Sequence, residues 1–269
     1  MLKDITLGQY FSGNSILHRL DPRIKIISVL VYAISVFMAK NIYSFLFLLL
    51  SVVVLVAISG ISYKIVLKSI KPVLFIVMFT AVINLFFTTT DEKPLIDWLF
   101  ITVYPQGVIT AVFVILRIVA LIVGTSVLLT YTTSPMALTD GLENLLSPLK
   151  KLKVPVHEFA MMMSIALRFI PTLIEETDKI MSAQKARGAD FESGNLIQRA
   201  KALVPVLVPL FISAFRRADE LACAMECRLY HGGGNRTRLH TLKYSRVDAL
   251  GGLVAVILCG GAIVVGFVL

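Results

Sequence analysis

The chain has 269 residues, of which 57% are hydrophobic, and its mean hydropathy is +0.83. A soluble domain of this size cannot bury so much apolar surface, so the composition excludes a water-soluble globular protein and indicates an integral membrane protein in a lipid bilayer. The net charge of +9 does not require nucleic acid as a partner, because lysine and arginine in a membrane protein first set its orientation.

The chain begins with a polar segment. Its first 23 residues contain no continuous apolar run, and the charged stretch His18–Lys25 precedes the first such run. A cleaved secretory signal needs an apolar core before its cleavage site, so this segment is expected to remain in the mature protein.

Five apolar runs are each close to the roughly 20 residues that a helix needs to cross about 30 Å of hydrocarbon. They are Ile24–Ala39, Ile42–Ser59, Pro72–Thr90, Gly107–Thr130 and Ala249–Leu269. The predicted fold is an all-α integral membrane protein with about five transmembrane helices, four of them in an N-terminal bundle at residues 1–130 and one at residues 248–269. The short link Lys40-Asn41 leaves open whether the first two runs form a tight hairpin or shorter, tilted helices.

The charges of the connections alternate along the chain. The N-terminal segment and the connection that carries Lys64, Lys68 and Lys71 are basic, whereas the other two connections carry a single lysine, Lys40, and a net negative charge at residues 91–97. The positive-inside rule therefore places the N-terminus and residues 131–247 in the cytoplasm, and the C-terminus outside.

Residues 131–247 are too long for a loop and show helical spacing throughout. A short helix is expected after Ser134-Pro135, a cap followed by proline. Two long helical stretches come next, the first bent at Pro171 and ending at Gly188, and the second ending at glycines 232–234. Each is apolar first and charged afterwards, so both are predicted to be amphipathic helices that lie against the bundle without crossing it.

A pattern at Asp178, Ala183 and Arg187 recurs forty-one residues later, where the arginine is Arg228. Each arginine follows a run of small residues near a predicted helix end, so a partner could approach it closely. A guanidinium is always charged and can pair bidentately with a carboxylate. The repeat therefore predicts two docking points for a two-subunit or pseudo-symmetric partner.

Three segments carry a family resemblance: "ITLGQYFSGNSILHRLDPRIK", "LRFIPTLIEETDKIMSAQKARGADF" and "RRADELACAMECRLYHGGG". Together they resemble the transmembrane T component of energy-coupling factor vitamin transporters, and the resemblance covers the chain from end to end. It implies a multi-pass scaffold in a bacterial cell membrane that joins two ATPase subunits to an interchangeable membrane S component for the uptake of vitamins or related micronutrients. Its long cytoplasmic coupling helices would each end in a triplet like alanine-arginine-glycine, with the arginines docked in grooves of the ATPases.

The first triplet matches this pattern fully, as Ala186-Arg187-Gly188, whereas the second, Cys227-Arg228-Leu229, keeps only the arginine. Leucine is bulkier than glycine, which raises the question of how closely the second helix end can seat. The resemblance also implies that ATP and Mg are bound by the partner ATPases and that this chain has no cofactor of its own.

Met161, Met162 and Met163 have two interpretations. Such a stretch usually packs in a core, but methionine surfaces also adapt to several partners. A T component that accepts different S components would use an interface of this kind, so these residues are a candidate S-component interface.

Structural roles are expected for two other sets of residues. Arg117 lies inside the fourth run, where a charge is costly unless paired, and a backbone carbonyl or Asn84 is its expected partner, with a substrate pathway as the alternative. Cys223, Cys227 and His231 could face one way on a helix and hold a metal with His240 or Glu226, but packing is favoured and no metal site is expected.

Phosphate-loop, G-x-S-x-G and H-E-x-x-H motifs do not occur in the sequence, so an enzyme is not expected. The alternative function is a membrane-embedded enzyme acting on lipid or prenyl substrates, with the polar segment as its active site. A self-sufficient secondary transporter is a third hypothesis, but it would place inverted repeats inside the spans, and the repeat here lies outside them.

Overall fold

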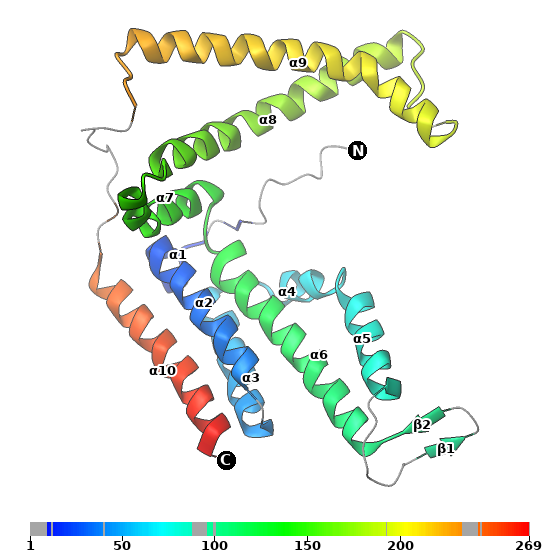
Figure 1. Ribbon diagram of the computed structural model, residues 1–269, viewed down its shortest axis with the longest axis vertical. Helices are drawn as coiled ribbons and strands as arrows, with labels where there is room; N and C mark the ends of the chain where they lie inside the picture. Colours follow the sequence, from blue (N-terminus) through cyan, green and yellow to red (C-terminus); the bar gives the residue numbers. More distant parts are fainter. Residues whose placement is uncertain are drawn as a thin grey trace. The chain divides into compact units, whose positions relative to one another are not determined.

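The computed structural model describes residues 10, 11, 13–39, 41–87, 96–98, 101–191, 193–232, 242 and 244–268. Contacts divide the chain into two compact units (Figure 1). The bundle unit lies within residues 8–142 and 242–269, and the long-helix unit lies within residues 143–241. The segments predicted from charge and hydropathy, 1–130, 131–247 and 248–269, stay a prediction.

Helices form most of the bundle unit, together with one short hairpin. The elements are α1 (Ile16–Arg19), α2 (Pro22–Met38), α3 (Ile42–Ser59), α4 (Tyr63–Ile70), α5 (Leu74–Phe87), β1 (Ile96–Trp98), β2 (Ile101–Val103), α6 (Pro105–Thr125), the π-helical turn η2 (Ser126–Thr130) and α10 (Arg246–Val268). The strands pair antiparallel, with Ile96 opposite Val103. Helix α7 (Pro135–Leu145) leads into the long-helix unit, which contains the 3₁₀ helix η3 (Ser147–Leu152), α8 (Val156–Ala186) and α9 (Leu196–Cys227).

A single carboxylate joins the first and last long helices of the bundle unit. Asp21 caps α2 by accepting the Arg23 N–H at 2.9 Å, with Pro22 at the first helical position. The Asp248 carboxylate accepts the backbone N–H of Asp21 at 2.7 Å and that of Ser245, just before α10, at 2.8 Å. Two helix starts that are far apart in sequence therefore share one buried acceptor.

Lys25 of α2 connects these helix starts to the segment that follows η2. It is only 3% exposed, and its Nζ donates to the Thr132 carbonyl at 2.8 Å and to the Thr133 hydroxyl at 3.2 Å. Thr132 lies two residues beyond the end of η2, where a positive charge is favourable, and the lysine satisfies its carbonyl. The charged motif before the first apolar run thus connects helix ends.

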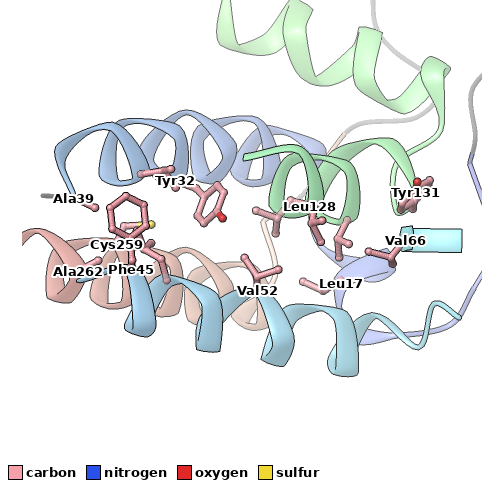
Figure 2. Packing of buried hydrophobic residues seen from close by; sticks show 14 of the residues in the cluster. Leu17, Tyr32, Ala39, Phe45, Val52, Val66, Leu128, Tyr131, Cys259 and Ala262 are labelled. Atoms are coloured by element: carbon pink, nitrogen blue, oxygen red, sulfur yellow. The ribbon is translucent and has the colours of Figure 1, made fainter. Parts of the chain in front are cut away.

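The core of the bundle unit lies between α2, α3, η2 and α10 (Figure 2). Phe45 of α3 stacks on Phe113 of α6 with ring centroids 5.1 Å apart, and the Tyr32 hydroxyl donates to the Ala120 carbonyl at 2.9 Å. A side chain at Gly124 would overlap the Tyr32 ring, so glycine allows α6 to approach α2 closely. In lipid, close packing and buried hydrogen bonds of this kind hold helices together. The hydrophobic effect does not drive the association there, because lipid tails are as apolar as the side chains.

The prediction for Arg117 is confirmed. Its Nη2 donates to the Ala39 carbonyl at 2.9 Å, and its guanidinium lies 5.6 Å from the centroid of the Phe45 ring. Ala39 follows the last residue of α2 and is fully buried. The arginine therefore satisfies a carbonyl at a helix C-terminus, where positive charge is favourable.

Five of the described helices are long and apolar enough to cross a membrane, which agrees with the predicted number. Their identities differ in part from the prediction. They are α3, α6 with η2, α8, α9 and α10, and a sixth is possible if α4 and α5, bent by 56° at their junction, form one span. The predicted first run forms α2, with only 17 residues, and α5 covers 14 residues of the predicted run Pro72–Thr90, whose last three residues lie outside the described part.

Candidate functional site

Helices α8 and α9 are the two long helical stretches expected from the sequence. They have 31 and 32 residues and continue through their internal prolines, Pro171 in α8 and Pro205 and Pro209 in α9. The two helices cross, and their C-terminal ends lie on opposite sides of the crossing (Figure 1). The Gln184 side chain donates to the Pro205 carbonyl at 3.5 Å, so the end of α8 lies beside the first half of α9.

An ion pair joins α8 and α9. Arg217 of α9 donates to the Glu176 carboxylate of α8 at 3.0 Å, and its guanidinium lies 5.9 Å from the centroid of the Phe169 ring. Both charged side chains are about a quarter exposed. Next to the pair, an apolar cavity of about 270 Å³ is lined by α8 residues such as Ile165 and α9 residues such as Met225. The contact therefore combines an ion pair with apolar packing that leaves a cavity.

This ion pair has the same spacing as the sequence repeat. Glu176 and Arg217 are forty-one residues apart, as are Arg187 and Arg228. Each of the two terminal arginines consequently lies eleven residues beyond its own helix's member of the ion pair. With a rise of 1.5 Å per residue, each end is about 16 Å from the ion pair, so the arginines are about 33 Å apart when measured along the two helices.

The first arginine ends α8 in a Schellman motif. The N–H of Gly188 donates to the Lys185 carbonyl at 3.0 Å, and that of Ala189 donates to the Gln184 carbonyl at 3.0 Å. Gly188 has a φ of 86°, in the left-handed region that glycine adopts at low cost. The predicted helix stop at Gly188 is therefore confirmed, with Arg187 as the capping residue.

The second arginine ends α9 in the same motif, earlier than predicted. Here Leu229 donates to the Glu226 carbonyl at 2.8 Å and Tyr230 to the Met225 carbonyl at 3.1 Å. Leu229 has a φ of 56°, so a leucine takes the left-handed position that Gly188 occupies in α8. The predicted stop at glycines 232–234 was wrong, because the Schellman hydrogen bonds end the helix at Cys227 without a glycine.

Both candidate triplets are on the surface of the described structure. Ala186, Arg187, Gly188, Cys227, Arg228 and Leu229 are all exposed. Neither terminal guanidinium has an ion-pair or hydrogen-bond partner within the described ranges. Leu229 is 78% exposed, which is unusual for a large apolar side chain in a strained backbone conformation. The two ends thus present similar turns, each with an available positive charge, but differ in the residue that follows it.

The methionines lie near the start of α8. Met162 and Met163 are about half exposed, whereas Met161 is partly covered and Ala160 is buried. A core role would bury the side chains, so their exposure keeps an interface role open. Arg187 lies at the other end of α8 from the methionines, whereas the Arg228 end of α9 lies on their side, since Ile165 and Met225 line the same cavity.

The cysteines and histidine of the metal alternative are also near the end of α9. Cys223 and Cys227 are exposed, and a ring nitrogen of His231 lies 2.8 Å from the Leu229 carbonyl. In the part of the chain that the structure describes, there is no group of three or more His, Cys, Asp or Glu side chains placed to hold a metal. His240 lies outside that part.

The comparison with known proteins is consistent over nearly the whole chain. The family model CbiQ, described as a cobalt transport protein, matches residues 13–240. Proteins named energy-coupling factor transporter transmembrane protein EcfT from Clostridium kluyveri and Acidaminococcus fermentans are 54% and 55% identical, over 96% and 94% of this chain and 95% and 94% of their own lengths. A protein of the same name from Bacillus subtilis is 49% identical over 92% of this chain and 93% of its own.

Proposed function

The chain belongs to the family of energy-coupling factor transporter transmembrane proteins, and we propose that its helices α8 and α9 couple this membrane component to ATPase subunits supplied by other chains. Family membership makes the chain a transporter subunit and gives no support to a membrane enzyme for lipid or prenyl substrates. ATP and Mg would be bound by the partner ATPases, and this chain would carry no cofactor.

The arrangement of the two terminal arginines is the observation that carries this proposal. Arg187 and Arg228 cap matching turns, are exposed, and have no ionic partner in the described ranges. About 33 Å of helix separates them, so one groove cannot hold both. Two equivalent grooves, one on each of two ATPase subunits, would fit equal arms that end in a guanidinium.

The charges of α8 and α9 favour a position outside the hydrocarbon, although both helices are long enough to cross it. The longest stretch without charge in α8 runs over nine residues between Glu158 and Arg168, and that in α9 over fourteen between Lys201 and Arg216. These lengths correspond to about 14 and 21 Å, less than the roughly 30 Å of a bilayer core. We place both helices at the cytoplasmic surface, with the N-terminus on the same side and the C-terminus outside.

The exposed methionines would contact the S component. Unbranched, flexible side chains at Met162 and Met163 can adapt to differently shaped surfaces. That property suits a scaffold that receives interchangeable S components, which would select the cargo. The relatives' names do not specify a cargo, and the description of the family model names cobalt. We propose vitamins or related micronutrients as the class of cargo.

The test is a double charge reversal, Arg187→Glu with Arg228→Glu. Both residues are exposed and outside the bundle core, so the variant should insert and fold like the unchanged protein. It should no longer co-purify with the two ATPase subunits, because truncation of a docked charge pair typically costs about 2–5 kcal/mol and reversal adds repulsion. A matched control is Arg199→Glu, an exposed arginine near the start of α9. Full assembly and uptake by the double variant would refute the docking function.

A further inference from the structure

The bundle unit contains a second cavity, unrelated to the arginines. It has a volume of about 480 Å³ and lies between α1, α2, α3, η2 and α10. Its walls are mostly aliphatic and include Leu55, Leu128 and Leu258. A volume of this size is within the usual range of about 300–1,000 Å³ for sites that bind small molecules.

The cavity has exposed lining residues on α3 and α10, and also on α1, where Ile16 is 62% exposed. Three of its lining residues, Ile58, Leu250 and Val254, are 45–62% exposed. Helices α3 and α10 are long and apolar enough to span a membrane. In a membrane-embedded protein, their exposed lining residues therefore face hydrocarbon, and the most abundant molecules at them are acyl chains.

Two polar residues on one face of α2 are among the residues that line the cavity. Lys25 and Ser28 are three residues apart, so they lie on the same side of the helix, and both line the cavity. The Lys25 ammonium has three N–H donors, of which two are used by Thr132 and Thr133. Ser28 is 9% exposed, and its hydroxyl has no hydrogen-bond partner within the described ranges, whereas the buried Ser35 and Ser51 each bond to a carbonyl in the preceding turn.

The Ser28 hydroxyl is available as a donor, so a polar atom that enters the cavity can bond to it without displacing an internal hydrogen bond. The length of the cavity indicates what else enters with it. Its lining residues on α10 run from Val247 to Leu258, a rise of about 17 Å. Half of a bilayer core is about 15 Å thick. The cavity therefore extends over one leaflet, with its polar groups near the N-terminal end of α2.

We propose that this cavity is a binding site for a phospholipid from the leaflet at the N-terminal end of α2. One acyl chain lies between α3 and α10, and an ester or phosphate oxygen accepts hydrogen bonds from the free Lys25 N–H and the Ser28 hydroxyl. Asp21 and Asp248 act electrostatically on Lys25 and balance its charge. Binding consequently depends on the acyl chain and the shared glycerophosphate group, so zwitterionic and anionic phospholipids bind alike. This inference requires only that the bundle is in the membrane, and it is independent of the coupling function.

The experiment is native mass spectrometry of the full chain, purified, delipidated and re-exposed to phosphatidylcholine or phosphatidylglycerol. The unchanged protein should retain one phospholipid of either kind. Ala255→Phe fills the cavity and should reduce retention at least about fivefold, corresponding to a loss of about 1 kcal/mol. Ile257→Phe is the matched control, because this residue is on the same helix, 61% exposed and outside the cavity lining, and it should retain lipid normally.

Ser28→Ala provides a second variant if Ala255→Phe does not fold. It removes one hydrogen bond without adding volume, and it should reduce retention at least about twofold. Equal retention by the folded variants and the unchanged protein would overturn the proposal. Retention of a co-purifying hydrophobic protein, with no lipid in the unchanged chain, would assign the cavity to a protein partner and overturn it as well.

Discussion

The two Schellman turns allow a direct measurement of what a leucine costs in the left-handed region. Gly188 and Leu229 hold equivalent positions with φ of 86° and 56°. The left-handed conformation costs a residue with a side chain about 1–2 kcal/mol, whereas glycine adopts it freely. Glycine in turn gives the unfolded chain more freedom, which offsets about 0.4–1 kcal/mol. Leu229→Gly should therefore stabilise the end of α9 by a net value of about 1 kcal/mol.

Little packing is lost in that exchange, because the Leu229 side chain is 78% exposed. The reciprocal change, Gly188→Leu, should destabilise the end of α8 by a similar amount. Hydrogen exchange measures these differences locally, at the amides of Leu229 and Tyr230 in α9 and of Gly188 and Ala189 in α8, which make the capping hydrogen bonds. A change of 1 kcal/mol is about a fivefold change in protection, slower exchange in Leu229→Gly and faster exchange in Gly188→Leu.

The two variants also serve as controls for each other, since the hydrogen-exchange protection of both turns can be measured in both proteins. Unchanged protection at the α9 end of Leu229→Gly would refute the assignment of strain to this leucine. An increase in protection together with weaker ATPase assembly would show that the leucine side chain, kept at a cost in stability, contributes to docking.

Two further predictions concern the crossing and the orientation. Reversing one charge of the ion pair, in Glu176→Arg or Arg217→Glu, should lower the stability of the long-helix unit by about 1 kcal/mol, and the double swap should recover part of it; a thermal-unfolding double-mutant cycle with no coupling would contradict the contact. A cysteine at the exposed Asn195, in a chain whose native cysteines are replaced by serine, should react with an impermeant maleimide only after the membrane is opened, and labelling of intact cells would reverse the proposed orientation.

Local patterns made the helices between residues 135 and 227 largely predictable. Polar and apolar spacing predicted α7, α8 and α9, and the cap at Ser134, which accepts the Ala137 N–H at 3.2 Å, agrees with the expected helix start. The end of α8 was also predictable, because glycine is the usual residue after a helix. The end of α9 was not, since leucine is disfavoured in the left-handed region and the nearest glycines lie farther along the chain.

Contacts between distant residues were less accessible. The Asp21–Asp248 hydrogen bond joins residues that are 227 positions apart, and neither side chain has a spacing that indicates the other. The length of α5 is another example, because hydropathy shows where a chain is apolar but not where a helix bends or stops. The Glu176–Arg217 pair is different: its members are separated by the repeat length, so a comparison of the two repeats for opposite charges could have found it.

This pair gives the crossing a mechanical consequence for the proposed coupling. Both terminal arginines lie eleven residues beyond it, so a rotation of one helix against the other about this contact moves both ends by equal distances. With arms of about 16 Å, a rotation of 10° displaces each end by about 3 Å, which is comparable to a shift of two residues along a helix. In the proposed coupling, motion of either partner subunit would reach this contact, and the end of α8 also contacts α9 where Gln184 donates to the Pro205 carbonyl. A substitution in the ion pair should consequently affect both docking points together, whereas a substitution in one triplet should affect a single partner subunit.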